Sequence, residues 1–404
     1  MNTSFLRFPD GFFWGTATSS YQIEGGLTND WSAWEQSPRR LADLERRGLG
    51  PATDFQSGQA ANSWEHLEDD IAAIKRLNNT AYRFSVEWSR IEPEEGRFDG
   101  EALARYAHFV QRLKEEGIEP FVTLWHWPLP LWLHEKGGWE YAGIAERFAL
   151  YAEKVVSALA GVRFWITLNE PEGFSGNSYL IGLWPPQKTN PFAYWRVLSH
   201  LVAAHKRAHE VIKRLVPDSQ VSISTPRAYF VSWPDPISRL ARFFARWWWN
   251  DRLLDRVADT IDFVGFNYYW RVKVKLFGYS KNEGERRSDM GWEIYPEGIY
   301  HELISLKKYN LPIYITENGL ADATDALRPA FIRDMLANVH RAIGEGADVR
   351  GYFYWSLLDN FEWSHGFGPK FGLYGVDRTT WQRLPRPSAD VYAQIAKHNG
   401  LEPL

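Results

Sequence analysis

Short apolar runs alternate with longer amphipathic segments along most of the chain. A run of about four to eight apolar residues is typical of a strand that is buried on both faces. Such runs predict strands at Phe12–Ala17, Thr80–Ser85, Pro120–Leu124, Arg163–Leu168, Gln220–Ser224, Ile261–Phe266, Pro312–Thr316 and Arg350–Trp355. A segment with helical periodicity follows most of them, which is the pattern of repeated strand–helix units.

The longer segments repeat their apolar residues at spacings of three and four, the period of a helix. In Ala60–Leu77 the residues with this spacing are Ala61, Trp64, Leu67, Ile71, Ile74 and Leu77. Further helices are predicted at Glu101–Glu116, Ala142–Leu159, Phe192–Leu215, Ile237–Arg256, Gly298–Lys308, Pro329–Ile343 and Pro387–His398.

Eight strands with intervening helices close naturally into an α/β fold of the (β/α)8 TIM-barrel type. The alternative is an open, doubly wound sheet, which usually has fewer strands and a glycine-rich phosphate turn after the first. Neither GxGxxG nor GxxxxGK[ST] occurs in the sequence, so the barrel is favoured. No linker divides the chain, and residues 1–404 are expected to form a single barrel domain.

Composition narrows the classes of partner. Hydrophobic residues make up 45% and charged residues 24% of the chain, as in a globular protein with a substantial core. The net charge of −4, without a long basic block, argues against nucleic acid. No apolar run approaches the roughly 18 residues that span a bilayer, so no membrane partner is expected. The N-terminus lacks signal-peptide features, so secretion is not expected. Without cysteine there is no disulfide or thiolate site, and a cytoplasmic location is expected.

Two short strings carry the clearest chemical signal. Thr167-Leu168-Asn169-Glu170-Pro171 and Ile315-Thr316-Glu317-Asn318-Gly319 each place a glutamate at the end of a predicted strand. A glutamate closing one strand is more often a cap or a surface ion pair. Two such carboxyl groups are what hydrolysis of a glycosidic bond requires.

Aromatic residues support this hypothesis. They make up 16% of the chain and include 21 tryptophans. Most are expected in the core, and others in a cleft where an indole stacks on a sugar ring. The Trp247-Trp248-Trp249 run is compatible with a packed helix, an exposed contact patch or a cleft wall, and core packing is favoured.

Polar and aromatic residues follow nearly every predicted strand, at the end of a barrel where active sites lie. They are Tyr21-Gln22, Arg83, Glu87, His126-Trp127, Asn169-Glu170, Asn267-Tyr268-Tyr269, Glu317 and Trp355. Each residue alone is better explained by packing or a local ion pair. Their coincidence at seven strand ends favours a shared site.

The chemistry requires one carboxyl group that is protonated and one that is ionised. A cation and hydroxyl donors lower the pKa of the carboxyl group that they contact, so Arg83 and Tyr269 are candidates to keep one glutamate ionised. The residues alone do not indicate which glutamate this is. They also leave open whether the two groups lie about 5 Å apart, as in retaining enzymes, or about 6.5–9.5 Å apart, as in inverting ones.

The chain resembles glycoside hydrolase family 1, the β-glucosidase and β-galactosidase family, from Phe8 to about His398. The matching strings, besides the two glutamate strings, are Phe8 through Gly25, Tyr82 through Ile91, Thr123-Leu124-Trp125-His126-Trp127, and Trp355 through Trp363. They occur in the family's order along the chain.

The resemblance implies a TIM barrel and a retaining exo-β-glycosidase that cleaves neutral β-glycosides and short β-oligosaccharides, with glucosides, fucosides and galactosides as candidates. Glu170 would be the acid/base and Glu317 the nucleophile, held ionised by Arg83 and Tyr269, while Asn169 would bind the 2-hydroxyl. The expected sugar subsite comprises Gln22, His126, Asn169, Trp355, Glu362 and Trp363, and the strand-end residues Trp127 and Asn267 are further binding candidates. A cis peptide after Trp355 is also implied.

Three alternatives remain. A 6-phospho-β-glucosidase is disfavoured, because Glu362 would repel a phosphate and Pro369 stands where the phosphate-binding lysine aligns, although Lys370 is adjacent. A transglycosylating β-glycosidase would use the same residues. A non-hydrolytic sugar-binding barrel is disfavoured because both glutamates are present.

No cofactor or metal is expected. The sequence has no HExxH string, and His205 and His209, four residues apart on a predicted helix, fit an amphipathic face better than a metal site. A small-molecule glycoside is the expected partner, and a homo-oligomer is compatible with the sequence.

Overall fold

The computed structural model describes residues 5–275, 278–280, 284 and 286–402 of the chain. Eight parallel strands pair in a ring, and the last pairs with the first, with Gly351 opposite Phe13. They are β2 (Phe13–Ala17), β3 (Ala81–Ser85), β4 (Glu119–Trp125), β5 (Phe164–Asn169), β6 (Gln220–Ser232), β7 (Val264–Val274), β9 (Ile313–Asn318) and β10 (Val349–Trp355). The predicted (β/α)8 barrel is confirmed, with each strand at its predicted place.

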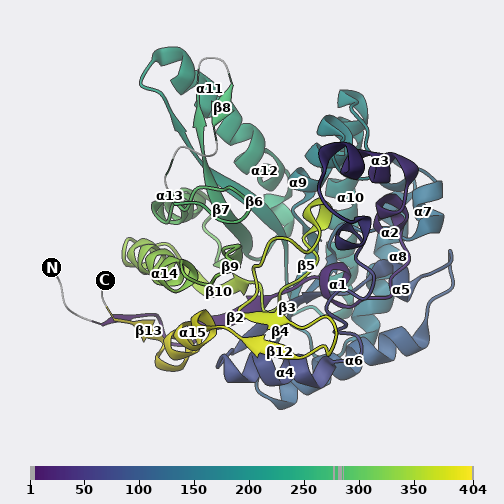
Figure 1. Ribbon diagram of the computed structural model, residues 1–404, viewed down its shortest axis with the longest axis horizontal. Coiled ribbons are helices and arrows are strands. Elements are labelled where there is room, and N and C mark those ends of the chain that lie inside the picture. The colour runs from purple at the N-terminus through teal and green to yellow at the C-terminus, as the bar shows by residue number, and fades with distance from the viewer. Residues whose placement is uncertain (1–4, 276–277, 281–283, 285, 403–404) are drawn as a thin grey trace.

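Helices pack around this ring and over its ends (Figure 1). The longer ones are α3 (Pro38–Arg47), α4 (Leu67–Arg76), α6 (Gly100–Glu115), α8 (Ile144–Ala158), α10 (Pro191–Leu215), α11 (Pro236–Arg246), α13 (Glu297–Leu306), α14 (Arg328–Gly344) and α15 (Pro387–His398). Shorter ones are α1 (Ser20–Ile23), α2 (Asp30–Glu35), α5 (Trp88–Ile91), α7 (Leu131–Glu135), α9 (Pro171–Ser175) and α12 (Arg252–Val257).

Minor elements complete the chain. The 3-10 turns are η1 (Ala52–Phe55), η2 (Gly138–Glu140), η5 (Ala258–Thr260), η6 (Lys307–Tyr309) and η7 (Trp363–His365), and the π-helical turns are η3 (Gly176–Ile181) and η4 (Trp247–Asp251). Two antiparallel pairs, β1 (Leu6–Arg7) with β13 (Gly400–Leu401) and β11 (Tyr374–Val376) with β12 (Arg383–Pro385), lie outside the barrel.

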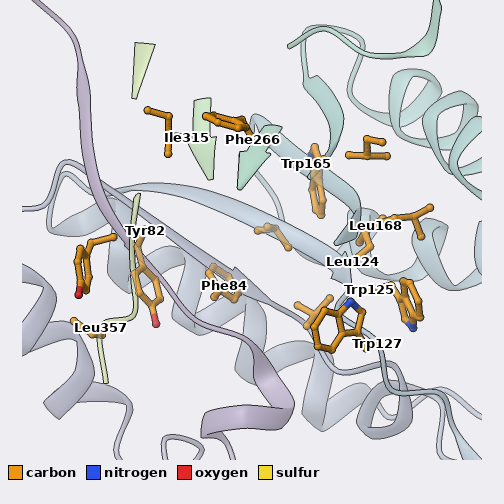
Figure 2. Close-up of a cluster of buried hydrophobic side chains, with 14 of the residues drawn as sticks. Tyr82, Phe84, Leu124, Trp125, Trp127, Trp165, Leu168, Phe266, Ile315 and Leu357 are labelled. Carbon is orange, nitrogen blue, oxygen red and sulfur yellow. The ribbon is translucent and has the colours of Figure 1, made fainter. Parts of the chain in front are cut away.

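Alternating residues of the strands belong to two different apolar layers, because successive side chains of a strand point to opposite faces. One cluster comprises Phe121, Phe164, Phe263, Tyr314 and Phe353 and fills the barrel interior. Phe121 and Phe164 stack there with ring centroids 4.1 Å apart. Their sequence neighbours belong to the outer cluster, which packs against the helices and of which Figure 2 shows Tyr82, Phe84, Trp165, Phe266 and Ile315.

Strands β6 and β7 extend well past the barrel as a parallel ribbon, which the sequence prediction did not include. Their pairing continues to Ser232 opposite Val274, and β8 (Tyr279–Ser280) adds to the edge. Helix α11 lies against the ribbon, and the whole unit projects from the barrel in Figure 1. The alternation of apolar and polar residues in Trp270–Val274 is the signal that could have revealed it.

The predicted helix at Ala60–Leu77 is too long, because α4 begins only at Leu67. Ala60 and Asn62 have φ of +48° and +53°, a left-handed conformation that a helix does not accommodate. Trp64 instead lies under the guanidinium of Arg90, 3.8 Å from its ring centroid. The predicted helix at Ile237–Arg256 is also interrupted, by the π-helical turn η4.

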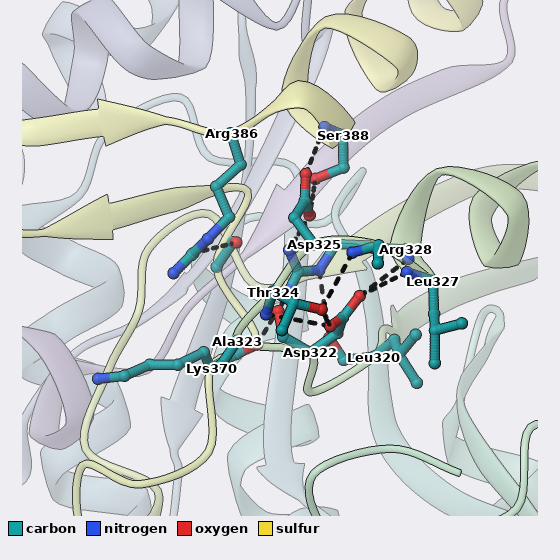
Figure 3. Close-up of polar contacts among 12 residues, drawn as sticks. Leu320, Asp322, Ala323, Thr324, Asp325, Leu327, Arg328, Lys370, Arg386 and Ser388 are labelled. Atoms are coloured by element: carbon teal, nitrogen blue, oxygen red, sulfur yellow. Dashed lines mark hydrogen bonds and ion pairs between the residues drawn. The ribbon is translucent and has the colours of Figure 1, made fainter. Parts of the chain in front are cut away.

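A buried ionic cluster fixes the segment that follows β9 (Figure 3). Arg328 pairs with Asp325 and donates to the carbonyl oxygens of Asp322 and Lys370, both at 2.6 Å. Asp325 in turn accepts a hydrogen bond from the Ser388 hydroxyl at 2.7 Å. The cluster therefore joins the chain after β9 to the segment after β10 and to α15.

We predict that Arg328→Met lowers the free energy of unfolding by about 3–5 kcal/mol, because it leaves Asp325 buried without its cation. Arg97→Met is the matched control, since Arg97 pairs with Glu94 at the surface, with side-chain exposures of 62% and 70%. It should cost about 1 kcal/mol or less. Urea unfolding measures both, and similar losses for the two variants would contradict the structural role of the cluster.

Candidate active site

A cavity of about 710 Å³ opens at the carboxyl ends of the barrel strands. Both glutamates of the two sequence strings line it, together with seven other residues singled out in the sequence: His126, Trp127, Asn169, Tyr269, Trp355, Glu362 and Trp363. The closed ring of parallel strands brings these positions together, because all of them follow or end strands at the same rim.

Glu317 closes β9 and is held by two donors. The Arg83 guanidinium donates to its Oε1 at 2.5 Å, and the Tyr269 hydroxyl donates to its Oε2 at 2.8 Å. Arg83 is fully buried on β3 and also donates to the Thr123 hydroxyl and to Asn169 Oδ1. One desolvated cation thus links four strands of the barrel.

Glu170 lies just past β5, with φ of +45° in the left-handed region. Asn267 Nδ2 donates to Glu170 Oε1 at 2.8 Å. The amide orientation is fixed, because Asn267 Oδ1 accepts from the hydroxyls of Ser224 and Thr316. An acidic proton on Glu170 therefore belongs on Oε2, which lies beside Gly173 at the cavity wall.

The two carboxyl groups have unequal surroundings. Burial raises the pKa of Glu170 to about 8, and the negative charge of Glu317 adds to this rise. Burial also raises the pKa of Glu317, but Arg83 and the Tyr269 hydroxyl act against the rise. Because the cation contacts Glu317 and not Glu170, a single proton shared by the pair resides on Glu170.

Asn169 connects the arginine to a histidine. Its Oδ1 accepts from Arg83 at 2.6 Å, so its Nδ2 is a donor and lies 3.1 Å from His126 Nε2. Burial and the charge of Arg83 lower the pKa of His126 well below its ordinary value, and the ring is neutral. His126 therefore carries its proton on Nδ1, a buried atom without a protein partner among the described residues, while the residue itself lines the cavity.

Aromatic rings surround the same part of the cavity. Trp355 stacks on His126 with centroids 5.9 Å apart, and Trp363 packs 4.5 Å from Trp127. The Trp127 indole donates to the Asn169 carbonyl oxygen at 3.0 Å, so its nitrogen is already engaged. Trp127 and Trp363 have φ of +89° and +51°, which adds backbone strain of about 1–3 kcal/mol each at the site. The peptide between Trp355 and Ser356 is cis, as the resemblance implied.

Glu362 lines the cavity, and Gln22 lies behind it. Gln22 is fully buried, and its Nε2 donates to Glu362 Oε2 at 3.2 Å and to the Phe361 carbonyl oxygen at 3.0 Å. Burial and the charge of Glu317 raise the pKa of Glu362 to about 8. The expectation that Glu362 repels a phosphate by its charge is therefore weakened, because the group retains a proton near neutral pH.

Six of the strand-end residues lie outside the lining of the cavity. Three of them bond elsewhere: the Tyr21 hydroxyl donates to Glu35, Glu87 accepts from the hydroxyls of Ser20 and Ser89, and the Tyr268 hydroxyl donates to a backbone carbonyl. The other three, Gln22, Arg83 and Asn267, contact lining residues from behind. Lys370 is not a lining residue either, and Figure 3 shows its side chain directed away from the Asp322–Arg328 cluster.

The outer part of the cavity was not found from the sequence. It is lined by apolar residues of the ribbon, of the helices beside it and of the loop near η3: Ile181, Leu183, Trp184, Phe230, Ala241, Ala245, Trp248, Trp249, Val272 and Val274. The favoured core position of the tryptophan run is thus wrong, since Trp248 and Trp249 line the cavity and Trp247 is exposed. These residues lie beyond the strand ends that the barrel argument considers.

The geometry suits acid-assisted displacement. Two carboxyl groups face one cavity, and of the two only Glu317 contacts a cation, with neutral polar donors and aromatic rings beside them. Within the described lining the only lysine or arginine is Lys275, which lies on the ribbon beyond β7.

Comparisons with known proteins agree with this chemistry. The model of glycosyl hydrolase family 1 matches residues 5–241 and 248–401. Beta-glucosidase A of Thermotoga maritima is 35% identical over 448 residues, which cover 98% of this chain and 99% of that protein. The resemblance inferred from the motifs is confirmed.

Solved structures agree as well. A β-glycosidase from Pyrococcus horikoshii superposes with a TM-score of 0.90 at 38% identity, covering 99% of this chain and 97% of the other. A β-glucosidase from Thermotoga maritima in complex with glucoimidazole gives a TM-score of 0.91 at 33% identity, covering 98% and 100%. The chain therefore belongs to glycosyl hydrolase family 1.

Proposed function

We propose that this glycosidase is a retaining exo-β-glucosidase, built as one catalytic domain, that hydrolyses neutral β-glucosides and short β-oligosaccharides. The observation that carries the proposal is the unequal environment of the two glutamates in one cavity. Relatives named as β-glucosidases support glucose as the sugar. Activity on fucosides and galactosides and a cytoplasmic location stay predictions.

In the first step Glu317 attacks the anomeric carbon while the bond to the leaving oxygen breaks, and Glu170 protonates that oxygen. A covalent glycosyl ester on Glu317 results. In the second step Glu170, now ionised, takes a proton from water, and the water oxygen attacks the anomeric carbon and displaces Glu317. Two inversions give a sugar product with the original β configuration.

The surrounding residues position the sugar. Asn169, already oriented by Arg83, would bind the 2-hydroxyl, and the His126 ring lines the same part of the cavity. Glu362, supported by Gln22, accepts hydroxyl donors at the far side of the ring, where Trp355 and Trp363 provide apolar surface. The apolar outer part of the cavity suits a hydrophobic leaving group, and an alcohol bound there would favour transglycosylation over hydrolysis.

Glu317→Ala should lower kcat by about 10⁴-fold or more, because no other carboxylate can form the ester. Azide should restore turnover of an activated nitrophenyl glucoside and release the α-glucosyl azide, since the small anion enters the space left by the side chain. Product stereochemistry by NMR tests this prediction. An active Glu317→Ala enzyme would refute the mechanism.

The pH profile should identify the acid. With Glu170 protonated in the active form, kcat/KM should fall as the pH rises through about 8, the raised pKa of Glu170. Because the pKa of Glu362 is raised to a similar value, Glu362→Gln is the control. The alkaline limb should persist in that variant, and its disappearance would assign the limb to Glu362 instead.

The same reasoning predicts a lower pKa of Glu170 in the Glu317→Gln variant. Removing the negative charge of Glu317 should lower the pKa of Glu170, which NMR titration of labelled glutamate can follow in the inactive protein. An unchanged pKa would show that the two carboxyl groups do not interact.

A panel of nitrophenyl β-glycosides tests the choice of sugar. We expect the highest kcat/KM for the neutral glucoside over the galactoside, fucoside, mannoside and 6-phosphoglucoside, because no cation lines the inner part of the cavity within the described residues. A dominant rate with 6-phosphoglucoside would support the phospho-β-glucosidase alternative. No turnover of any glycoside by folded protein would favour the sugar-binding barrel.

A further inference from the structure

Helix α11 buries its small residues and exposes its large apolar ones. Ser238 is its one buried residue, and Ala241 and Ala245 pack on the cluster of Phe230, Val272 and Val274 on the ribbon. A surface helix of a globular protein normally turns its largest apolar residues toward the core. The residues on the inward side of α11 are small and bury little apolar surface, so most of the apolar surface of the helix stays exposed.

The outward side carries a continuous apolar stripe, which we call the α11 face. It consists of Ile237, Leu240, Phe243, Phe244 and Trp247, with exposed fractions of 59%, 58%, 65%, 56% and 43%. Their spacings of three and four place them on one side of the helix. Trp233, just before the helix, is 47% exposed as well. Exposed apolar patches of this kind mark interaction surfaces.

Positive charge borders the α11 face. Arg239 and Arg242 are exposed, and helical spacing places them beside the apolar stripe. The ammonium groups of Lys273 and Lys275 lie 5.1 and 5.7 Å from the Trp233 ring centroid. The helix itself carries no acidic side chain. Arginine beside tryptophan, phenylalanine and leucine on one short helix is the chemistry of a segment that lies flat in a lipid–water interface.

The position of the α11 face relates it to the cavity. Ala241, Ala245 and Trp248 contribute to the cavity lining from the same helical segment. On another part of the lining, Ile181 and Leu183 are 64% and 39% exposed. The family model matches the chain up to residue 241 and again from 248, so residues 242–247, with Phe243, Phe244 and Trp247, lie outside the matched pattern.

We propose that the α11 face docks the enzyme on anionic lipid membranes. Apolar side chains of the face enter the headgroup and acyl boundary, and Arg239 and Arg242 contact anionic headgroups. Docking brings the part of the cavity rim that Ala241, Ala245 and Trp248 line close to the lipid surface. None of the helices among the described residues is long and apolar enough to cross a membrane, and docking needs none. This proposal revises the expectation of no membrane partner, which rested on spanning segments alone.

Docking is independent of catalysis and is tested on the full chain by flotation with vesicles. Vesicles of phosphatidylglycerol and phosphatidylcholine in equal parts should bind the protein, and phosphatidylcholine alone should bind it more weakly. The triple variant Leu240→Ser, Phe243→Ser, Phe244→Ser should reduce binding at least about tenfold, because it removes most of the inserted apolar area. Arg239→Gln with Arg242→Gln should abolish most of the preference for anionic vesicles.

The matched control is Leu49→Ser with Leu384→Ser, which removes exposed leucines elsewhere, with exposed fractions of 39% and 48%. It should bind vesicles as the unaltered protein does. Turnover of nitrophenyl β-glucoside, if the proposed function holds, and circular dichroism in any case, report that each variant is folded. Absence of vesicle binding, or equal binding by the triple variant, would overturn the proposal. So would a lipid-free dimer in ultracentrifugation that the triple variant loses, because the face would then bind a second copy.

Discussion

The contact between Arg83 and Glu317 is the interaction on which the site depends. Arg83 is a charged group inside a barrel, where an unpaired cation would be strongly destabilising. Its donors are satisfied by Glu317, Asn169, Thr123 and the Thr316 carbonyl oxygen, which belong to β9, β5 and β4. One residue therefore offsets its own desolvation cost, lowers the pKa of the Glu317 carboxyl group against the effect of burial, and orients the Asn169 amide.

The rest of the inner site follows from that constraint. Because Arg83 contacts Glu317, the two glutamates differ in their surroundings, and burial and the charge of Glu317 raise the pKa of Glu170. Asn169 can only donate toward His126, whose low pKa leaves a neutral ring with a defined tautomer. The aromatic layer around Phe121 closes the barrel interior beneath this polar layer.

The outer part of the cavity is held in place by other contacts. It is formed by the extended β6–β7 ribbon and α11, which rest on the barrel through Arg227, a buried cation that contacts Asp251 and Glu302. Its lining consists mostly of apolar side chains, which make few directional contacts. The same unit carries the α11 face, and the structure thus combines a rigid polar site with a hydrophobic entrance.

The sequence by itself determined the barrel, the place of each strand and most of the inner site. Buried parallel strands leave continuous apolar runs, and the closed ring then brings residues at their carboxyl ends to one rim. The two glutamates, Arg83, His126 and Tyr269 could therefore be placed together before any coordinates. The order of the polar strings also indicated the family.

Only the tertiary structure decided the remainder. Three features of the site depend on distances between residues far apart in sequence. They are the position of Gln22 behind the cavity lining, the choice of carboxyl group that contacts Arg83, and the effect of burial on the pKa of Glu362. The start of α4 depended on the left-handed residues Ala60 and Asn62, and their conformation is fixed by long-range contacts. The exposure of Phe243 and Phe244 was hidden because helical periodicity shows that a face is apolar but not whether the core or the solvent lies opposite it.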